Sequence, residues 1–178
     1  MLVEKLKAER IYAGGILREM AKHKGMTLQE LLTFAETHPE IHTTVDTEIA
    51  RKAKELDAQG KIIIVEGRVQ FHFLPESCKL FIKVSIEEGA RRIWKDLQSQ
   101  KTREERNEGS AVSLEATTKK VAQRIEEDRK RYLQLYKVDL YQESIYDIVV
   151  DTTRMTAEQA AEKVVQLLRA QGKLHQKR

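Results

Sequence analysis

The stretch "RIYAGGILREMAKHKGMT", residues 10–27, joins a short apolar run, a glycine pair and a segment with helical spacing. Gly14 and Gly15 let the backbone approach a ligand closely, and Arg18 lies in the first turn of the helix expected to follow. A helix N-terminus beside a guanidinium favours an anion, because both carry positive potential. The stretch therefore predicts a strand, a tight turn and an anion-binding arginine. A solvated Arg18 on a helix surface is an equally compatible interpretation.

The segments on either side predict an α/β fold. Apolar runs predict strands at residues 10–13, 61–67, 79–85 and 147–152, and apolar residues at helical spacing predict helices at 15–24, 27–37, 43–58, 86–100, 113–136 and 156–171. Continuous apolar runs suit strands that are covered on both faces, so we expect a parallel sheet with helices on both sides. Two helices have capping-box pairs at their starts, Thr27 with Glu30 and Thr156 with Gln159.

Length and composition limit the class of protein. The 178 residues suffice for a single domain, 1–178, in which the polar residues 101–112 predict a mobile loop and residues 170–178 a basic tail. The formal charge of +4, from 32 basic and 28 acidic side chains, implies neither a nucleic-acid nor a membrane partner. A single cysteine, Cys78, and the lack of any apolar run of ~18 residues predict a cytoplasmic protein.

Charged residues follow the predicted strand at 61–67. Glu66 ends this strand, and Arg68 comes two residues later, after Gly67. In an α/β sheet, ligands bind beyond the carboxyl ends of the strands. A carboxylate there suits a metal-bound phosphate, and a guanidinium suits a bare phosphate oxygen. We therefore expect Glu66 and Arg68 to belong to a phosphate site.

Two further groups of cations lie in predicted helices and in the polar loop. Arg124, Asp128 and Arg131 are spaced four and three residues apart, which places them on one helical face. A surface salt-bridge ladder is the more common role of such a stripe, and a binding role requires that it face a cleft. The second group suits a loop that covers a transferring phosphoryl group, although a solvated face is the alternative. It comprises Arg91, Arg92, Lys101, Arg103 and Arg106.

The sequence lacks the residue patterns that several other kinds of functional site require. The five histidines and Cys78 show no metal-ligand spacing, so we predict no metal site built from histidine and cysteine. Motifs for nucleophilic hydrolysis or zinc proteolysis do not occur in the sequence. An RNA-binding module is the least favoured class, because the cations are not interleaved with aromatic residues on strands.

Five segments in order carry a family resemblance: "YAGGILREMAKHKGMTLQELLTFAETHPEIHTTVD", "IIIVEGR", "RRI", "QRIEEDRKRYLQLYKVDL" and "SIYDIVVDTTRMTAEQAAEKVV". They resemble the cytidylate kinases, in particular the short archaeal-type ones, over nearly the whole chain. The resemblance implies a P-loop NTPase-like nucleoside monophosphate kinase fold with a parallel sheet. It also implies transfer of a phosphoryl group from ATP to CMP or dCMP with Mg²⁺, so the expected partners are nucleotides.

The resemblance also assigns roles to residues of this chain. Gly14, Arg18 and Arg68 are expected to hold the acceptor nucleotide at its phosphate. Contacts to the acceptor's sugar and phosphate are expected from Arg124, Asp128 and Arg131. Arg92, Arg131 and Glu66 are expected to act in catalysis, with Glu66 near magnesium. Arg92 and the polar loop are expected to form a lid, at about residues 95–113.

The sequence departs from the family pattern at several positions. Tyr12 stands where serine is common, Gly15 where an acidic residue is common, and Gly89 where an arginine is usual. The family also opens with a strand and a G-x-x-x-x-G-K-[ST] loop that cradles the ATP phosphates, and no such loop occurs in these 178 residues. We therefore expect a sheet without its first strand and weak or absent phosphoryl transfer by the chain as it stands.

Two alternative functions are kept open. One is a non-catalytic nucleotide-binding or interaction protein that retains the monophosphate pocket. The other is a kinase for a different small acceptor, because the departures fall on residues expected to contact the base. The oligomeric state does not follow from the sequence.

Overall fold

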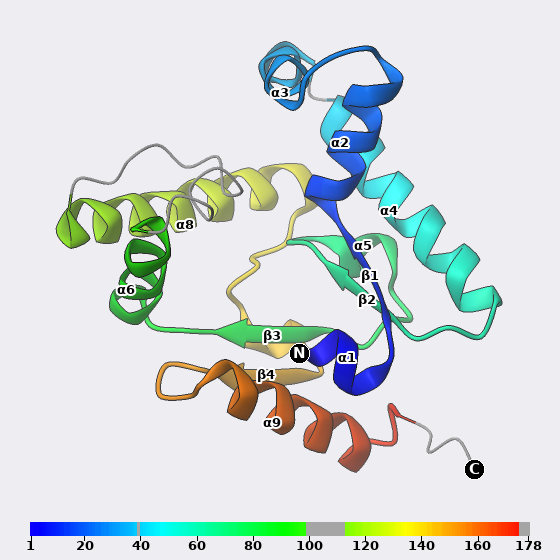
Figure 1. Ribbon diagram of the computed structural model, residues 1–178, viewed down its shortest axis with the longest axis vertical. Helices are drawn as coiled ribbons and strands as arrows, with labels where there is room; N and C mark the ends of the chain where they lie inside the picture. The colour runs from blue at the N-terminus through cyan, green and yellow to red at the C-terminus, as the bar shows by residue number, and fades with distance from the viewer. Residues whose placement is uncertain (39, 99–112, 175–178) are drawn as a thin grey trace. The chain divides into compact units, whose positions relative to one another are not determined.

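The computed structural model describes residues 1–38, 40–98 and 113–174 (Figure 1). The chain forms two compact units, which we call unit 1 (Met1–Cys78 with Val165–Arg178) and unit 2 (Lys79–Val164). Each unit is described by itself. The single domain expected over residues 1–178 stays a prediction.

Unit 1 is built on two short parallel strands. β1 (Glu9–Tyr12) pairs with β2 (Ile63–Glu66), with Glu9 opposite Ile63 and Tyr12 opposite Glu66. The strand β1 follows the short helix α1 (Leu2–Leu6), which ends at Lys7 in the left-handed region with φ 48°. The parallel register brings the carboxyl ends of β1 and β2 to the same edge, which is where the sequence places its phosphate-binding residues.

Four helices complete unit 1. They are α2 (Ala13–His23), α3 (Leu28–Thr37), α4 (Glu40–Ala58) and α5 (Gln70–Phe73). The predicted capping box at the start of α3 is confirmed, because the Thr27 side chain accepts from the Glu30 backbone N–H and the Glu30 carboxylate accepts from that of Thr27. Leu31 and Ile49 are fully buried in a core that α2, α3 and α4 share with Ile11 of β1. The apolar face of these helices therefore supports the strand that ends at Tyr12.

Unit 2 contains the second pair of parallel strands. β3 (Leu80–Lys83) pairs with β4 (Ile148–Asp151), and α6 (Ile86–Leu97) packs against α8 (Leu114–Tyr136). A 3₁₀ turn, η1 (Glu143–Ile145), precedes β4, and α9 (Ala157–Ala170) follows it. The residues of α9 from Val165 on belong to unit 1. The predicted capping pair Thr156 and Gln159 forms both of its hydrogen bonds at the start of α9.

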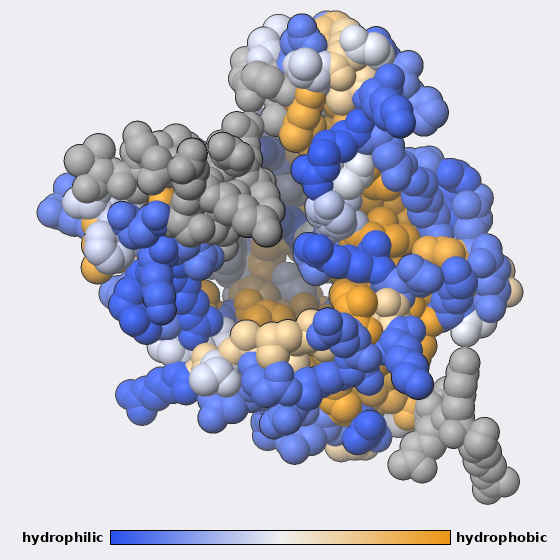
Figure 2. Space-filling view, in the orientation of Figure 1, coloured by the Kyte–Doolittle hydropathy of each residue, from blue (hydrophilic) through white to orange (hydrophobic). Residues whose placement is uncertain are grey.

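Aromatic packing and an exposed apolar face distinguish the two sides of β3. Phe81 stacks on Tyr146 with ring centroids 4.8 Å apart. Ile82 and Val84, which alternate with Phe81 along the chain, are 47% and 38% exposed. Figure 2 shows apolar atoms in the region of β3 and hydrophilic residues over the outer side of α4.

The predicted mixed α/β fold with parallel strands is confirmed. All four expected strands are present. The first is shifted by one residue to Glu9–Tyr12, and the other three are trimmed to four residues. Within the described residues, each sheet has two strands. The short helix α5 was not predicted, and residues 99–112 of the expected loop lie outside the described ranges. Among the described helices, none has the length and apolar character needed to cross a membrane.

Candidate functional site

The carboxyl ends of β1 and β2 form the first candidate site. Tyr12 and Glu66 are register partners at the last position of the two strands. The helix α2 begins directly after Tyr12, with Gly14 and Gly15 in its first turn and no side chain capping its N-terminus. Arg18 is exposed on this helix, and Arg68 is exposed two residues beyond β2. Unit 1 thus presents both arginines that the sequence assigns to phosphate, one after each strand.

The side chain of Arg18 is held by Tyr12. Arg18 Nη2 donates a hydrogen bond to the Tyr12 hydroxyl, and the guanidinium carbon lies 5.4 Å from the ring centroid. A Cβ atom added to Gly14 would lie 3.3 Å from Tyr12 Cε2 and 3.7 Å from Arg18 Nη2. The glycine in this first helical turn therefore gives room for both side chains.

Arg10 of β1 and Glu66 of β2 form a bidentate ion pair. Arg10 Nε and Nη2 donate to the two Glu66 carboxylate oxygens at 2.8 and 2.7 Å, and both side chains are about half exposed. The hydrogen bonds to Glu66 raise the pKa of Arg10 above its usual range. The guanidinium of Arg10 also lies 4.4 Å from the Tyr12 ring centroid. Arg10 thus uses one acceptor site on each Glu66 oxygen and leaves the second site of each open.

The turn between Glu66 and Arg68 is packed on Gln70. Gln70 is 6% exposed, and its Nε2 donates to Asp46 Oδ1 of α4 at 2.6 Å. Its Cγ occupies the space that a Cβ at Gly67 would need. This packing explains why a glycine stands between Glu66 and Arg68.

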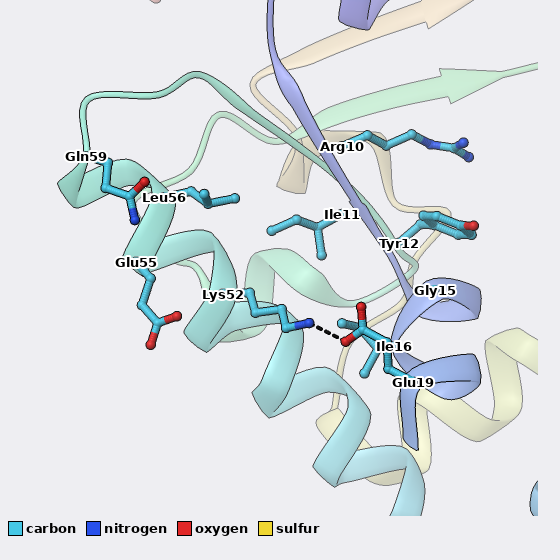
Figure 3. A pocket seen from close by; sticks show the side chains of 10 residues that line it. All are labelled: Arg10, Ile11, Tyr12, Gly15, Ile16, Glu19, Lys52, Glu55, Leu56 and Gln59. Atoms are coloured by element: carbon cyan, nitrogen blue, oxygen red, sulfur yellow. Dashed lines mark hydrogen bonds and ion pairs between the residues drawn. The ribbon is translucent and has the colours of Figure 1, made fainter. Parts of the chain in front are cut away.

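A pocket of about 320 Å³ opens in unit 1 between β1, α2 and α4 (Figure 3). Figure 3 shows Ile11 pointing into it toward α4, whereas Arg10 and Tyr12 point to the opposite side of the strand. Lys52 of α4 and Glu19 of α2 form an ion pair in it. Arg18 and Arg68 do not line this pocket. The pocket is therefore distinct from the site at which these two arginines are expected to bind the phosphate.

The predicted stripe on α8 is not a simple surface ladder. Arg124 and Arg131 are exposed, whereas Asp128 between them is buried with its side chain 5% exposed. Arg131 Nη2 donates to Asp128 Oδ1 at 2.9 Å. A carboxylate inside the protein that holds an exposed guanidinium fixes the direction of that guanidinium. In unit 2, the buried Asp128 carboxylate therefore fixes the position of the exposed Arg131 guanidinium.

Arg92 is held by hydrogen bonds to three residues of unit 2. Its Nε donates to Glu88 Oε1 at 2.7 Å, and its Nη2 donates to the carbonyl oxygens of Thr152 at 2.7 Å and Met155 at 3.2 Å. The hydrogen bonds from Arg91 and Arg92 hold the pKa of Glu88 below its usual range. In this arrangement Arg92 ties α6 to the turn that follows β4, and the catalytic role expected for it stays a prediction.

The remaining predicted groups fall outside these two clusters. Lys101, Arg103 and Arg106 lie outside the described residues. Within the described ranges, no group of three or more histidine, cysteine or acidic side chains is placed to hold a metal ion. Glu66, the acid that the sequence assigns to magnesium, therefore belongs to no such group among the described residues.

The sequence did not assign a role to Arg10 or to the Tyr12 ring. Strand alternation places both side chains on one face of β1, and the register places Glu66 beside them. Alternation was available from the sequence, but the register was not. The pairing of Arg10 with Glu66 therefore becomes visible only in the structure.

This chain is similar in sequence to one family of known proteins. A profile of the family described as cytidylate kinase matches residues 4–170. The cytidylate kinase of Pyrococcus abyssi is 35% identical over 151 residues, which cover 84% of this chain and 74% of the relative. That of Pyrococcus furiosus is 34% identical over 158 residues, covering 88% and 73%. That of Methanocaldococcus jannaschii is 35% identical over 163 residues, covering 89% and 82%. The mixed α/β arrangement agrees with a P-loop nucleoside monophosphate kinase fold, and the chain belongs to the cytidylate kinase family.

Proposed function

We propose that the protein is a cytidylate kinase that uses ATP to phosphorylate CMP or dCMP to the diphosphate. The observation that carries this proposal is the placement of Arg18 and Arg68 after the two neighbouring strands of unit 1, in a chain of this family. Both guanidiniums are exposed at the end of the sheet where α/β proteins bind ligands. Two arginines there suit the doubly charged phosphate of a nucleoside monophosphate.

The contribution of unit 1 is to bind and orient the acceptor phosphate. Arg18 and Arg68 balance its charge, and the open N-terminal turn of α2 at Gly14 adds backbone N–H donors. In the transfer, an acceptor phosphate oxygen forms a bond to the γ-phosphorus of ATP as the bond between that phosphorus and the β–γ bridging oxygen breaks, leaving ADP. Holding the attacking oxygen in line is most of what a protein adds to such a reaction.

For unit 2 we propose a contact role for three residues of α8. Arg131 is set in position by the buried Asp128, and Arg124 lies on the same helical face, four residues before Asp128. The family resemblance assigns all three to the sugar and phosphate of the acceptor. An arginine side chain that a buried carboxylate already holds in place loses less conformational entropy on binding than a freely rotating one.

Magnesium would accompany the nucleotide phosphates and would neutralise the charge that develops on them. Glu66 has the chemistry to contact such an ion, directly or through water. Arg10 occupies one acceptor site on each Glu66 oxygen, so a contact to the ion would use the second site. No described group of carboxylates forms a separate cage for the ion.

Two measurements test the proposed function with the 178-residue chain. Calorimetric titration with CMP, dCMP, UMP and AMP measures acceptor binding, and a coupled assay for ADP measures phosphoryl transfer from ATP. The expected result is binding of CMP and dCMP in preference to UMP and AMP. Absence of binding by any of the four monophosphates contradicts the proposal.

The transfer assay separates the kinase from the non-catalytic alternative. ADP formation that depends on CMP identifies a kinase, whereas CMP binding without ADP formation identifies a nucleotide-binding protein. Best binding and turnover with AMP or UMP would instead identify a kinase for another acceptor. The Arg18→Ala variant controls for contaminating kinases, because their activity does not depend on this residue.

A further inference from the structure

The Tyr12 ring packs against Gly14 and Gly15. A Cβ atom at Gly15 would lie 3.2 Å from Cε1 and 3.5 Å from Cδ1 and Cζ of the ring, and one at Gly14 would lie 3.3 Å from Cε2. Approaches of 3.2–3.3 Å between carbon atoms are closer than ordinary van der Waals contact, which lies near 3.5–4.0 Å. The two edges of the ring therefore occupy space that side chains at positions 14 and 15 would otherwise enter.

Two guanidiniums complete the surroundings of the ring. Arg10 lies 4.4 Å and Arg18 5.4 Å from the ring centroid, and Arg18 also donates to the ring hydroxyl. Arg10 in turn is bonded through two nitrogens to Glu66 on the neighbouring strand. The chain of contacts thus runs from β2 through Glu66, Arg10 and Tyr12 to α2.

We propose that Tyr12 is a positioning residue for Arg18 and that Gly15 is a glycine because Tyr12 occupies this place. The inference rests on the proposed function, since it takes Arg18 as an arginine that binds the acceptor phosphate. Tyr12 itself needs no contact with the nucleotide. Its ring and hydroxyl reduce the freedom of the Arg18 side chain before the anion arrives, and a preorganised side chain binds with a smaller entropic cost.

The hydrogen bond to Tyr12 leaves Arg18 able to bind a phosphate. A guanidinium carries N–H donors along two edges, and Tyr12 accepts from one N–H of Nη2. The edge that does not face the hydroxyl keeps its two parallel donors for a pair of phosphate oxygens. Glu66 balances the charge of Arg10, so among the described residues the positive charge beside the Tyr12 ring that has no ion pair is that of Arg18.

A double-mutant cycle tests the coupling between positions 12 and 15. The dissociation constant for CMP is measured by calorimetry for the unchanged chain, Tyr12→Ser, Gly15→Ala and the double variant. We expect Gly15→Ala alone to weaken CMP binding about threefold to tenfold, and to have less than a twofold effect when Tyr12 is already serine. An equal effect of Gly15→Ala in both backgrounds overturns the inference.

Thermal unfolding distinguishes positioning from a loss of structure. Alanine favours a helix more than glycine does, so Gly15→Ala is expected to keep or raise the unfolding temperature while it lowers CMP affinity. Gly89→Ala in α6 is the matched control, because its Cβ would also meet a neighbour closely, at 3.3 Å from Val84 Cγ1. This control is expected to leave CMP affinity unchanged.

A ligand-free measurement keeps the inference testable if CMP does not bind. The Nε–H signal of Arg18 is identified in ¹⁵N spectra by its loss in Arg18→Lys, and its relaxation reports the order of the side chain. Tyr12→Phe keeps the ring and removes the hydroxyl, and it is expected to lower the order of Arg18. Unchanged relaxation in Tyr12→Phe contradicts the positioning role. Failure of CMP binding with the expected relaxation change contradicts the proposed function alone.

Discussion

Arg18 of unit 1 and Arg92 of unit 2 are both arginines that the sequence assigns to phosphate chemistry, yet their donors go to different partners. Arg18 is exposed and donates to one tyrosine hydroxyl. Arg92 donates to a carboxylate and to two backbone carbonyl oxygens. The comparison teaches that the partners of a guanidinium, rather than its place in a motif, separate an arginine available for a ligand from one that holds two elements together.

The largest effect is expected from Arg18→Ala. Losing a charge-assisted, two-pronged contact should weaken CMP binding about 100-fold, with little change in the free energy of unfolding. Calorimetric titration with CMP and urea unfolding check the two halves of this expectation. Lys22→Ala removes one positive charge from an exposed position of the same helix and is expected to change CMP affinity less than threefold.

The converse result is expected from Arg92→Ala. This change removes the donor that joins α6 to the carbonyl oxygens of Thr152 and Met155, whereas Arg91 still donates to Glu88. It should lower the free energy of unfolding by about 1–2 kcal/mol. CMP affinity should change little if Arg92 acts only as a tie within unit 2. A loss of CMP affinity as large as that of Arg18→Ala, at unchanged stability, would remove the distinction between the two arginines.

Tyr146 of unit 2 provides a further comparison at alkaline pH. Tyr146 donates to the Leu140 carbonyl oxygen at 2.8 Å, and burial raises its pKa from 10.0 to about 12. The folded state therefore keeps this proton up to a higher pH than the unfolded state does. Its contribution is complete below pH 10 and is lost as pH rises through 12.

Because Tyr146 is partly exposed, we expect a contribution of about 1 kcal/mol. Urea unfolding of the unchanged chain and of Tyr146→Phe between pH 8 and 12 measures it. The stability of the unchanged chain should fall more steeply than that of the variant above pH 10. Parallel curves would show that Tyr146 does not titrate differently on folding.

The smallest effect is expected at acidic pH, from Glu88. Arg91 and Arg92 lower its pKa from the ordinary value of 4.5, so its stabilising contribution is present above pH 4.5 and is lost as pH falls through the lowered folded value. Thermal unfolding of the unchanged chain and of Glu88→Gln between pH 3 and 7 measures this contribution. The difference between them should be greatest near neutral pH and shrink as the acid becomes protonated.

Much of the fold followed from local signals in the sequence. The β-branched run at 61–67 and the capping pair Thr27 with Glu30 each predict an element that the structure contains, because both signals act over a few neighbouring residues. The four-residue helix α5 escaped prediction, since so short a segment has no periodicity to detect.

The partners of the site residues did not follow from the sequence. Arg10 and Glu66 are 56 positions apart, and their pairing depends on the register of β1 against β2. The burial of Asp128 depends on which face of α8 turns inward, which the spacing of Arg124, Asp128 and Arg131 leaves open. The two backbone carbonyls that hold Arg92 have no signature in the sequence at all.

The seat of the Tyr12 ring on Gly14 and Gly15 also bears on how this site could have changed during evolution. A tyrosine arriving at position 12 while position 15 still carried a side chain would have met that side chain at its first carbon. A glycine arriving first at position 15 would have left room, at the modest cost of a less favoured helical residue. The geometry therefore gives the two substitutions a preferred order, glycine before tyrosine, and makes reversal of the first one difficult once the second is in place.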